Sequence, residues 1–105
     1  MLTEKQKNII INAFMPFKPN RIGVFGSYAK NEGTKDSDID ILFEVDAKIT
    51  LFTIGGIYMD LKEKLKTDVD LVEFSAIHPL LKDEILSEVK VFYDAKSKFK
   101  KLLLI

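Results

Sequence analysis

The stretch that most constrains the fold of this chain is residues 21–45, where a buried segment runs into a glycine-serine turn. Residues 21–25 form a short apolar run that is typical of a strand. Gly26 permits a tight turn and lets an anionic group approach without meeting a Cβ, while Ser27 offers a hydroxyl. Residues 28–31 can then form only a brief helix. The order strand, turn and helix start therefore predicts a site for an anion such as phosphate.

The second strand of this stretch carries two carboxylates on one face. Asp38 and Asp40 are two residues apart and project together, because side chains alternate along a strand. The opposite face is apolar and consists of Ile39, Ile41, Phe43 and Val45. Neighbouring carboxylates repel and raise a pKa unless a cation neutralises them, and oxygen ligands suit Mg²⁺. The pair therefore predicts a magnesium site.

The rest of the chain predicts alternating helices and strands. Thr3 with Gln6 is a capping box for a first helix, which Pro16 ends. Further expected elements are a helix at 49–66, a strand at 68–74, a short helix after Pro79 and an edge strand at 91–93. We therefore expect an α/β (α+β) fold, a small mixed β-sheet flanked by helices, in a single domain over residues 1–105.

Length and charge limit the class of protein. The 105 residues are 47% hydrophobic, which suffices for one core. Sixteen basic residues balance sixteen acidic ones, which disfavours a polymeric nucleic acid as ligand. There is no apolar signal core, no run as long as a membrane span and no cysteine. These features predict a cytoplasmic protein that does not enter the membrane.

Residues 26–42 resemble the signature of the DNA polymerase β-like nucleotidyltransferase superfamily, and most closely its minimal nucleotidyltransferase branch. That pattern is Gly-Ser, ten residues and Asp-x-Asp, with a third carboxylate on a later strand. The resemblance implies the polymerase β-like core, with ATP as donor and two Mg²⁺ ions held by Asp38 and Asp40. It also implies that Gly26 and Ser27 bind the phosphates.

The third carboxylate has two candidates. Asp70 matches the family position and would act as metal ligand and general base, whereas Asp68 shares its face of the strand and is the alternative. A structural role at the strand entrance is the third interpretation. Lys30 replaces the arginine usual in the family and offers a point charge to phosphate. Ser37, just before Asp38, is expected either to bind the loop or phosphate or to serve the turn.

The resemblance also implies a partner. Minimal nucleotidyltransferases are commonly antitoxins that adenylylate a tyrosine of a helical HEPN-domain toxin, so the expected partners are a nucleotide and such a protein, or a homo-oligomer. The alternative is an antitoxin that has lost catalysis and neutralises its partner by binding alone. The apolar end of the chain, Leu102 to Ile105, is expected to pack on its own sheet or on a second chain.

Overall fold

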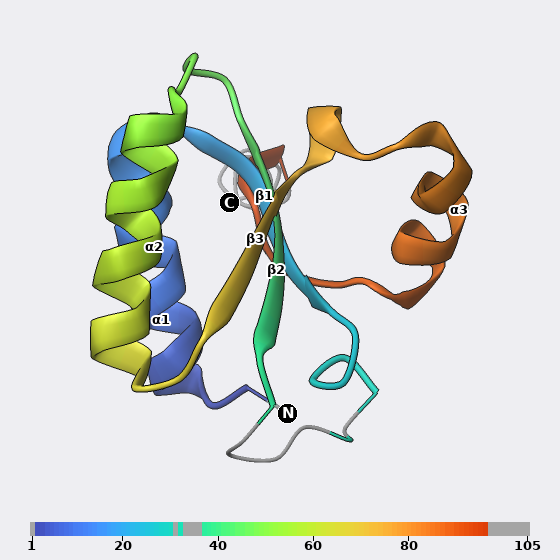
Figure 1. The fold of residues 1–105 in the computed structure, drawn as a ribbon, viewed down its shortest axis with the longest axis horizontal. Coiled ribbons are helices and arrows are strands. Elements are labelled where there is room, and N and C mark those ends of the chain that lie inside the picture. The colour runs from blue at the N-terminus through green and yellow to red at the C-terminus, as the bar shows by residue number, and fades with distance from the viewer. Residues whose placement is uncertain (1, 31, 33–36, 97–105) are drawn as a thin grey trace, which may run out of the picture.

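The computed structural model describes residues 2–30, 32 and 37–96, which form helices on both sides of a four-stranded sheet (Figure 1). In chain order the elements are α1 Glu4–Phe14, η1 Met15–Phe17, β1 Pro19–Phe25, β2 Ile39–Val45, α2 Leu51–Leu65, β3 Val69–Glu73, η2 Phe74–Ala76, α3 Pro79–Glu88 and β4 Lys90–Asp94, where η marks a 3₁₀-helix. The expected helices and strands are confirmed to within a few residues, including the last edge strand, except for the brief helix at residues 28–31.

The sheet is mixed, as expected, with strand order β3-β2-β1-β4. β1 pairs antiparallel with both β2 and β4, whereas β2 pairs parallel with β3. A parallel neighbour requires a long crossover, and α2 supplies it between β2 and β3. This crossover places the starts of β2 and β3 at the same end of the sheet.

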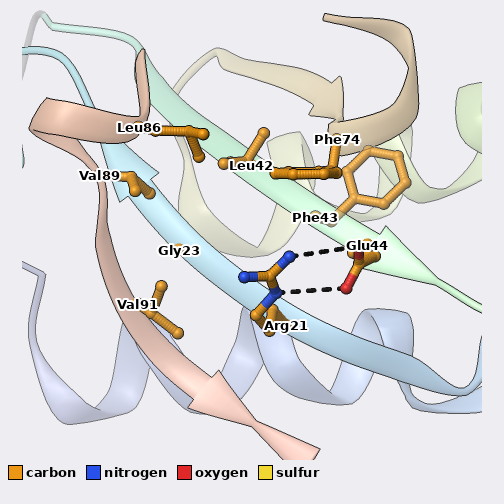
Figure 2. Close-up of a pocket in the computed structure, with 9 residues that line it drawn as sticks. All are labelled: Arg21, Gly23, Leu42, Phe43, Glu44, Phe74, Leu86, Val89 and Val91. Carbon is orange, nitrogen blue, oxygen red and sulfur yellow. Dashed lines mark hydrogen bonds and ion pairs between the residues drawn. The ribbon is translucent and has the colours of Figure 1, made fainter. Parts of the chain in front are cut away.

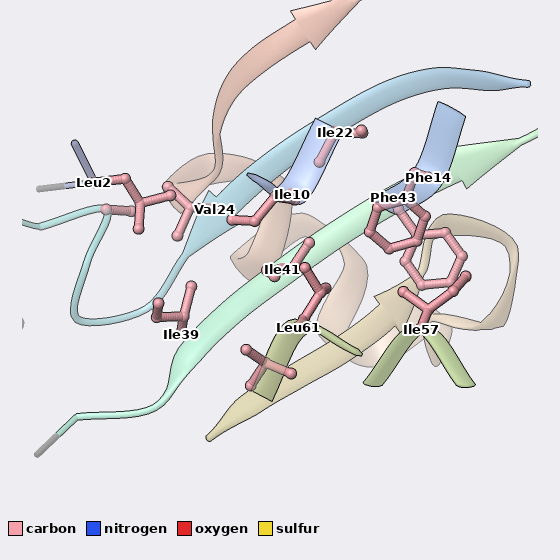
Figure 3. Close-up of a cluster of buried hydrophobic side chains, with 12 residues drawn as sticks. Leu2, Ile10, Phe14, Ile22, Val24, Ile39, Ile41, Phe43, Ile57 and Leu61 are labelled. Atoms are coloured by element: carbon pink, nitrogen blue, oxygen red, sulfur yellow. The ribbon is translucent and has the colours of Figure 1, made fainter. Parts of the chain in front are cut away.

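Helices α1 and α2 cover one face of the sheet, and η2 and α3 lie on the other side (Figure 1). The core fills the space between the sheet and the helices α1 and α2 (Figure 3). Phe14 of α1 and Phe43 of β2 pack there with ring centroids 4.8 Å apart. The alternation predicted for β2 is confirmed, because Ile39, Ile41 and Phe43 are all buried on this side. The carboxylate of Asp40 consequently belongs to the opposite face.

The helix starts follow local sequence signals. The capping box is present, with the N–H of Gln6 donating to Thr3 Oγ1 at 3.1 Å and that of Thr3 to Gln6 Oε1 at 2.9 Å. His78 caps α3, because its Nδ1 accepts the N–H of Leu80 at 3.1 Å. Within the described residues, no helix combines the length and the apolar character that crossing a membrane would require.

The brief helix expected at residues 28–31 is not formed in its described part. Residues 28–30 belong to a hydrogen-bonded turn, because one isolated helical turn fixes several torsions for a single bond. Asn31 and the apolar end from Leu102 to Ile105 lie outside the described residues. Asp38 lies directly before β2 rather than within it.

Candidate functional site

The turn after β1 places the backbone of Gly26 directly against the carboxylate of Asp40. Gly26 has a φ of 69°, in the left-handed region that favours glycine. A Cβ here would collide with Oδ2 of Asp40 and lie 3.2 Å from its Cγ. The N–H of Lys30 donates to the Gly26 carbonyl at 3.2 Å, and that of Glu32 to the Ser27 carbonyl at 2.9 Å. Glycine is therefore needed both for the turn and for the space that the carboxylate occupies.

Two of the predicted carboxylates are neighbours across the parallel strands. Asp40 of β2 is the register partner of Asp70 of β3, and on its other side it is paired with Phe25 of β1. Strands lie about 4.8 Å apart, so the two carboxylates project side by side from one face. Asp38 precedes β2 by one residue; it and Asp70 are exposed, whereas Asp40 is half-buried. The structure thus gathers these three acidic residues and the Gly26 turn at one end of β2.

The electrostatics of this end of β2 favour a cation. Burial raises the pKa of Asp40 above its ordinary 3.8, and the charges of Asp70 and then Asp38 raise it further. In the described part of the chain, no lysine or arginine forms an ion pair with any of the three. The donor set is all oxygen, which suits Mg²⁺.

The side chains of Asp38, Asp40 and Asp70 are too far apart in this structure to coordinate one metal ion together. Across residues 2–30, 32 and 37–96, no three acidic, histidine or cysteine side chains are gathered tightly enough to hold a metal ion. Asp38 and Asp70 would therefore have to turn toward Asp40 on binding one. Because both are exposed, their rotation is not blocked by the core.

The alternative third carboxylate, Asp68, is engaged elsewhere. Its Oδ1 lies 3.0 Å from Nζ of Lys62 in α2, and its carbonyl accepts the N–H of Ile39 at 3.0 Å. Asp68 thus ties the start of β3 to α2 and β2. This geometry supports the choice of Asp70 as the third carboxylate, which remains a prediction.

The two predicted phosphate-binding residues beyond the turn have other contacts in the structure. Nζ of Lys30 lies 3.1 Å from Glu88 Oε1 at the end of α3, and this bond raises the pKa of Lys30. The carbonyl of Ser37 accepts a hydrogen bond from Thr67 Oγ1 at 3.4 Å. Lys30 would therefore exchange Glu88 for a phosphate on binding one.

A pocket lies between the sheet and the segment of α3, on the face of β2 that also carries Asp40 (Figure 2). Leu42, two residues after Asp40, and its register partner Gly23 form part of its lining, and Leu86 and Val89 come from the α3 side. A Cβ on Gly23 would lie 2.7 Å from Val89 Cγ2, so this glycine lets the chain after α3 approach the sheet. No motif in the sequence indicates this pocket, although an isolated glycine within a strand is a signal of close approach.

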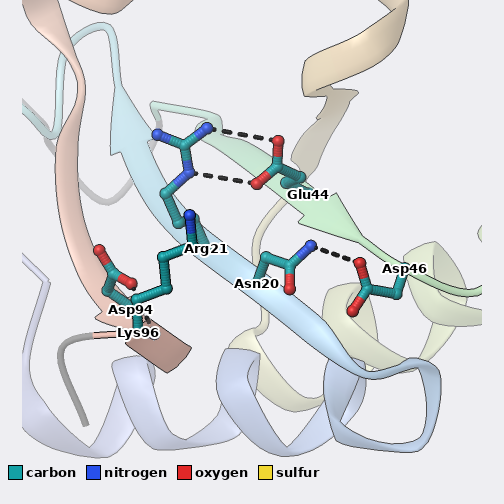
Figure 4. Close-up of polar contacts among 6 residues, drawn as sticks. All are labelled: Asn20, Arg21, Glu44, Asp46, Asp94 and Lys96. Atoms are coloured by element: carbon teal, nitrogen blue, oxygen red, sulfur yellow. Dashed lines mark hydrogen bonds and ion pairs between the residues drawn. The ribbon is translucent and has the colours of Figure 1, made fainter. Parts of the chain in front are cut away.

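A polar cluster lies at the other end of β1 (Figure 4). Arg21 binds Glu44 through Nε to Oε1 at 3.2 Å and Nη2 to Oε2 at 3.3 Å, and its guanidinium lies 5.0 Å from the ring centre of Phe74. Nδ2 of Asn20 donates to Asp46 Oδ1 at 2.8 Å. Because these groups satisfy one another, the acidic end of β2 is the better candidate for a ligand site.

The fold and the acidic end of β2 define a nucleotidyltransferase domain. Residues 6–98 match the family described as Polymerase beta, Nucleotidyltransferase, and the chain belongs to that family. The resemblance stated from residues 26–42 is confirmed, and the chain is a nucleotidyltransferase.

Similar proteins within this family are named protein adenylyltransferases. A Methanocaldococcus jannaschii protein named "Putative protein adenylyltransferase" is 42% identical over 82 residues, which are 78% of this chain and 88% of the relative. The protein adenylyltransferase MntA of Thermococcus cleftensis is 36% identical over 73 residues, which are 70% of this chain and 74% of the relative. A solved complex, described as a tri-AMPylated Shewanella oneidensis HEPN toxin with MNT antitoxin, contains a chain of the same fold. The comparison of this chain with that chain gives a TM-score of 0.72 at 22% sequence identity and covers 94% of this chain and 78% of the other.

Proposed function

We propose that this chain transfers AMP from ATP to a hydroxyl group of a partner protein. The observation that carries the proposal is the pairing of Asp40 with Asp70 beside the Gly26 turn, in a member of a nucleotidyltransferase family. The names of the two protein adenylyltransferases support AMP as the transferred group and a protein as its acceptor.

The turn would hold the triphosphate. Gly26 permits the left-handed turn, Ser27 offers its hydroxyl, and Lys30 contributes a positive charge once it leaves Glu88. Ser37 at the end of the loop is the remaining candidate for a phosphate contact. Together these groups would orient the α-phosphorus toward the acidic end of β2.

The carboxylates would hold the metal and move the proton. Asp38 and Asp40 would bind two Mg²⁺ ions, with Asp70 as a further ligand to one of them. When bound, Mg²⁺ neutralises the phosphates and lowers the pKa of the attacking hydroxyl. Asp70 accepts the hydroxyl proton, the hydroxyl oxygen bonds to the α-phosphorus, and the bond to the pyrophosphate oxygen breaks. Pyrophosphate leaves and the acceptor keeps AMP.

The acceptor would come from a second protein. On the face that carries Asp40 and Asp70, the described residues supply only η2 and α3, and none of the residues of α3 is buried. The solved complex with an AMPylated HEPN toxin supports a helical HEPN protein as partner and this chain as antitoxin. A tyrosine hydroxyl of that partner is the acceptor that we propose.

A transfer assay tests the proposal. The chain is incubated with Mg²⁺, ATP and a HEPN-domain protein from the same organism, and the partner is analysed by intact mass and peptide mapping. We expect added adenylyl groups on tyrosine, absent when EDTA is present or when Asp38 and Asp40 are both changed to Asn. Complex formation and toxin neutralisation without any added mass would instead support the antitoxin that acts by binding alone.

A further inference from the structure

Helix α2 leaves a continuous apolar face in water, opposite to the face that packs in the core. This outer face of α2 is formed by Leu51, Phe52, Gly55, Gly56 and Met59. Phe52 is 92% exposed, Leu51 87% and Met59 64%. At Gly55 and Gly56 a Cβ would meet no atom within 4 Å. An exposed phenylalanine beside a bare stretch of helix backbone indicates a contact surface.

The order of residues on this face is symmetrical. Phe52 lies three residues before Gly55, and Met59 lies three residues after Gly56. Residues seven apart share one side of a helix, so Phe52 and Met59 flank the glycines on the same face. If two α2 helices cross antiparallel at the glycines, Phe52 of each copy meets Met59 of the other. A two-fold contact requires this self-complementarity, and methionine adapts well to an aromatic ring.

The two ends of the outer face carry opposite charges. Lys48 lies in the loop just before α2, whose N-cap is Thr50, and Glu63 lies near the other end of α2, seven residues after Gly56; both are exposed. Neither forms an ion pair within the described part of the chain. Antiparallel pairing sets Lys48 of each copy toward Glu63 of the other, whereas parallel pairing would bring like charges together.

We propose that the outer face of α2 is the contact between two antiparallel copies of this chain. Helix α2 and the acidic residues lie on opposite sides of the sheet, because the buried face of β2 is the one that meets the helices α1 and α2 (Figure 1). The dimer therefore leaves Asp40 and Asp70 accessible to a nucleotide and to another protein. The inference does not depend on the proposed transfer reaction.

Sedimentation velocity over a wide concentration range tests the dimer. We expect the wild-type chain to dimerise and Phe52→Glu to weaken the dimer about 30-fold or more, as for a central aromatic contact. Leu80→Glu is the matched control, because Leu80 is 85% exposed but lies on α3. Lys48→Glu should weaken the dimer, and adding Glu63→Lys should restore it. A far-UV circular dichroism spectrum like that of the wild type and a cooperative thermal melt check that Phe52→Glu remains folded.

Disulfide trapping tests the antiparallel register, since the chain has no cysteine of its own. Chains carrying Phe52→Cys are mixed with chains carrying Met59→Cys and oxidised. We expect the mixed disulfide to dominate. A wild-type chain that stays monomeric, a Phe52→Glu dimer as stable as that of Leu80→Glu, or a preference for disulfides between two Phe52→Cys chains would each overturn the proposal. So would an outer face that is covered only when a different protein is present.

Discussion

Asp40 and Asp70 stand directly opposite each other in the parallel pairing of β2 with β3. The half-buried carboxylate of Asp40 is thereby held beside a second negative charge, and Asp38 adds a third. In the described part of the chain no basic side chain compensates them by an ion pair. The metal-free protein therefore carries a repulsion at the place where we propose that it binds Mg²⁺.

Asp40→Asn should change stability in opposite directions with and without ligand. In EDTA the variant should melt at a higher temperature than the wild type, because it removes one of the repelling, partly buried charges. With Mg²⁺ and ATP the wild type should gain stability by mass action and the variant should gain little. Differential scanning fluorimetry measures both. A variant that responds to Mg²⁺ and ATP as the wild type does would contradict the assignment of Asp40 to the metal.

The pH dependence of the metal-free protein should follow from the raised pKa of Asp40. The native state keeps this proton to a higher pH than the unfolded chain, whose carboxyl has the ordinary pKa of 3.8. The contribution of Asp40 to the free energy of unfolding therefore falls as the pH rises from 3.8 through the raised native pKa. Urea unfolding in EDTA across this interval measures it, with Asp40→Asn as the control. A difference between the two proteins that grows in the opposite sense would contradict the prediction.

The site is largely predictable because its chemistry is local in sequence. Gly26, Ser27, Asp38 and Asp40 occur at a fixed spacing in sequence. Alternation along β2 places Asp40 on the face opposite the buried Ile39 and Ile41, and Asp38 lies just before the strand. The choice between Asp68 and Asp70 cannot be made from alternation, since both share a face. It depends on the register of β3 against β2 and on the position of Lys62, which only the folded chain supplies.

The rest of the site depends on contacts between distant segments. Glu88 reaches Lys30 only because α3 and β4 return to the edge of β1, so nothing near Lys30 in sequence indicates its partner. The brief helix was predicted wrongly over its described part, Tyr28 to Lys30, because one isolated helical turn fixes several torsions for a single hydrogen bond. The close approach of Val89 to Gly23 depends in the same way on β4.

Gly26→Ala should destabilise the protein through two separable effects. The left-handed backbone costs a residue with a Cβ about 1–2 kcal/mol, and the new methyl group would also displace Asp40. In an Asp40→Ala background only the first cost should remain, so the two substitutions should not be additive. Chemical unfolding of the four proteins measures this coupling. Additive costs would show that Gly26 and Asp40 do not contact each other as described.

Asp70→Asn and Asp68→Asn should separate transfer from stability. Asp70→Asn should abolish AMP transfer while retaining most nucleotide binding, because its proposed role is to accept the proton of the acceptor. Asp68→Asn should keep transfer and lose only an exposed ion pair with Lys62, so its free energy of unfolding should change little. Lys62→Gln is the matched control and should behave like Asp68→Asn. Loss of transfer in Asp68→Asn alone would assign the third carboxylate to Asp68.

Lys30 and Glu88 should have opposite effects on ATP, because the 3.1 Å ion pair between them competes with a phosphate for the same ammonium group. Lys30→Gln should raise the KM for ATP, since the charge is lost. Glu88→Gln should lower it, since Lys30 is then free to turn toward the triphosphate, and kcat should change little in that variant. Glu84→Gln on the same helix is a control, because Glu84 acts on Lys30 through its charge and, unlike Glu88, makes no hydrogen bond to it. Initial rates of AMP transfer at varied ATP measure both constants, and an unchanged KM in Lys30→Gln would remove Lys30 from the nucleotide site.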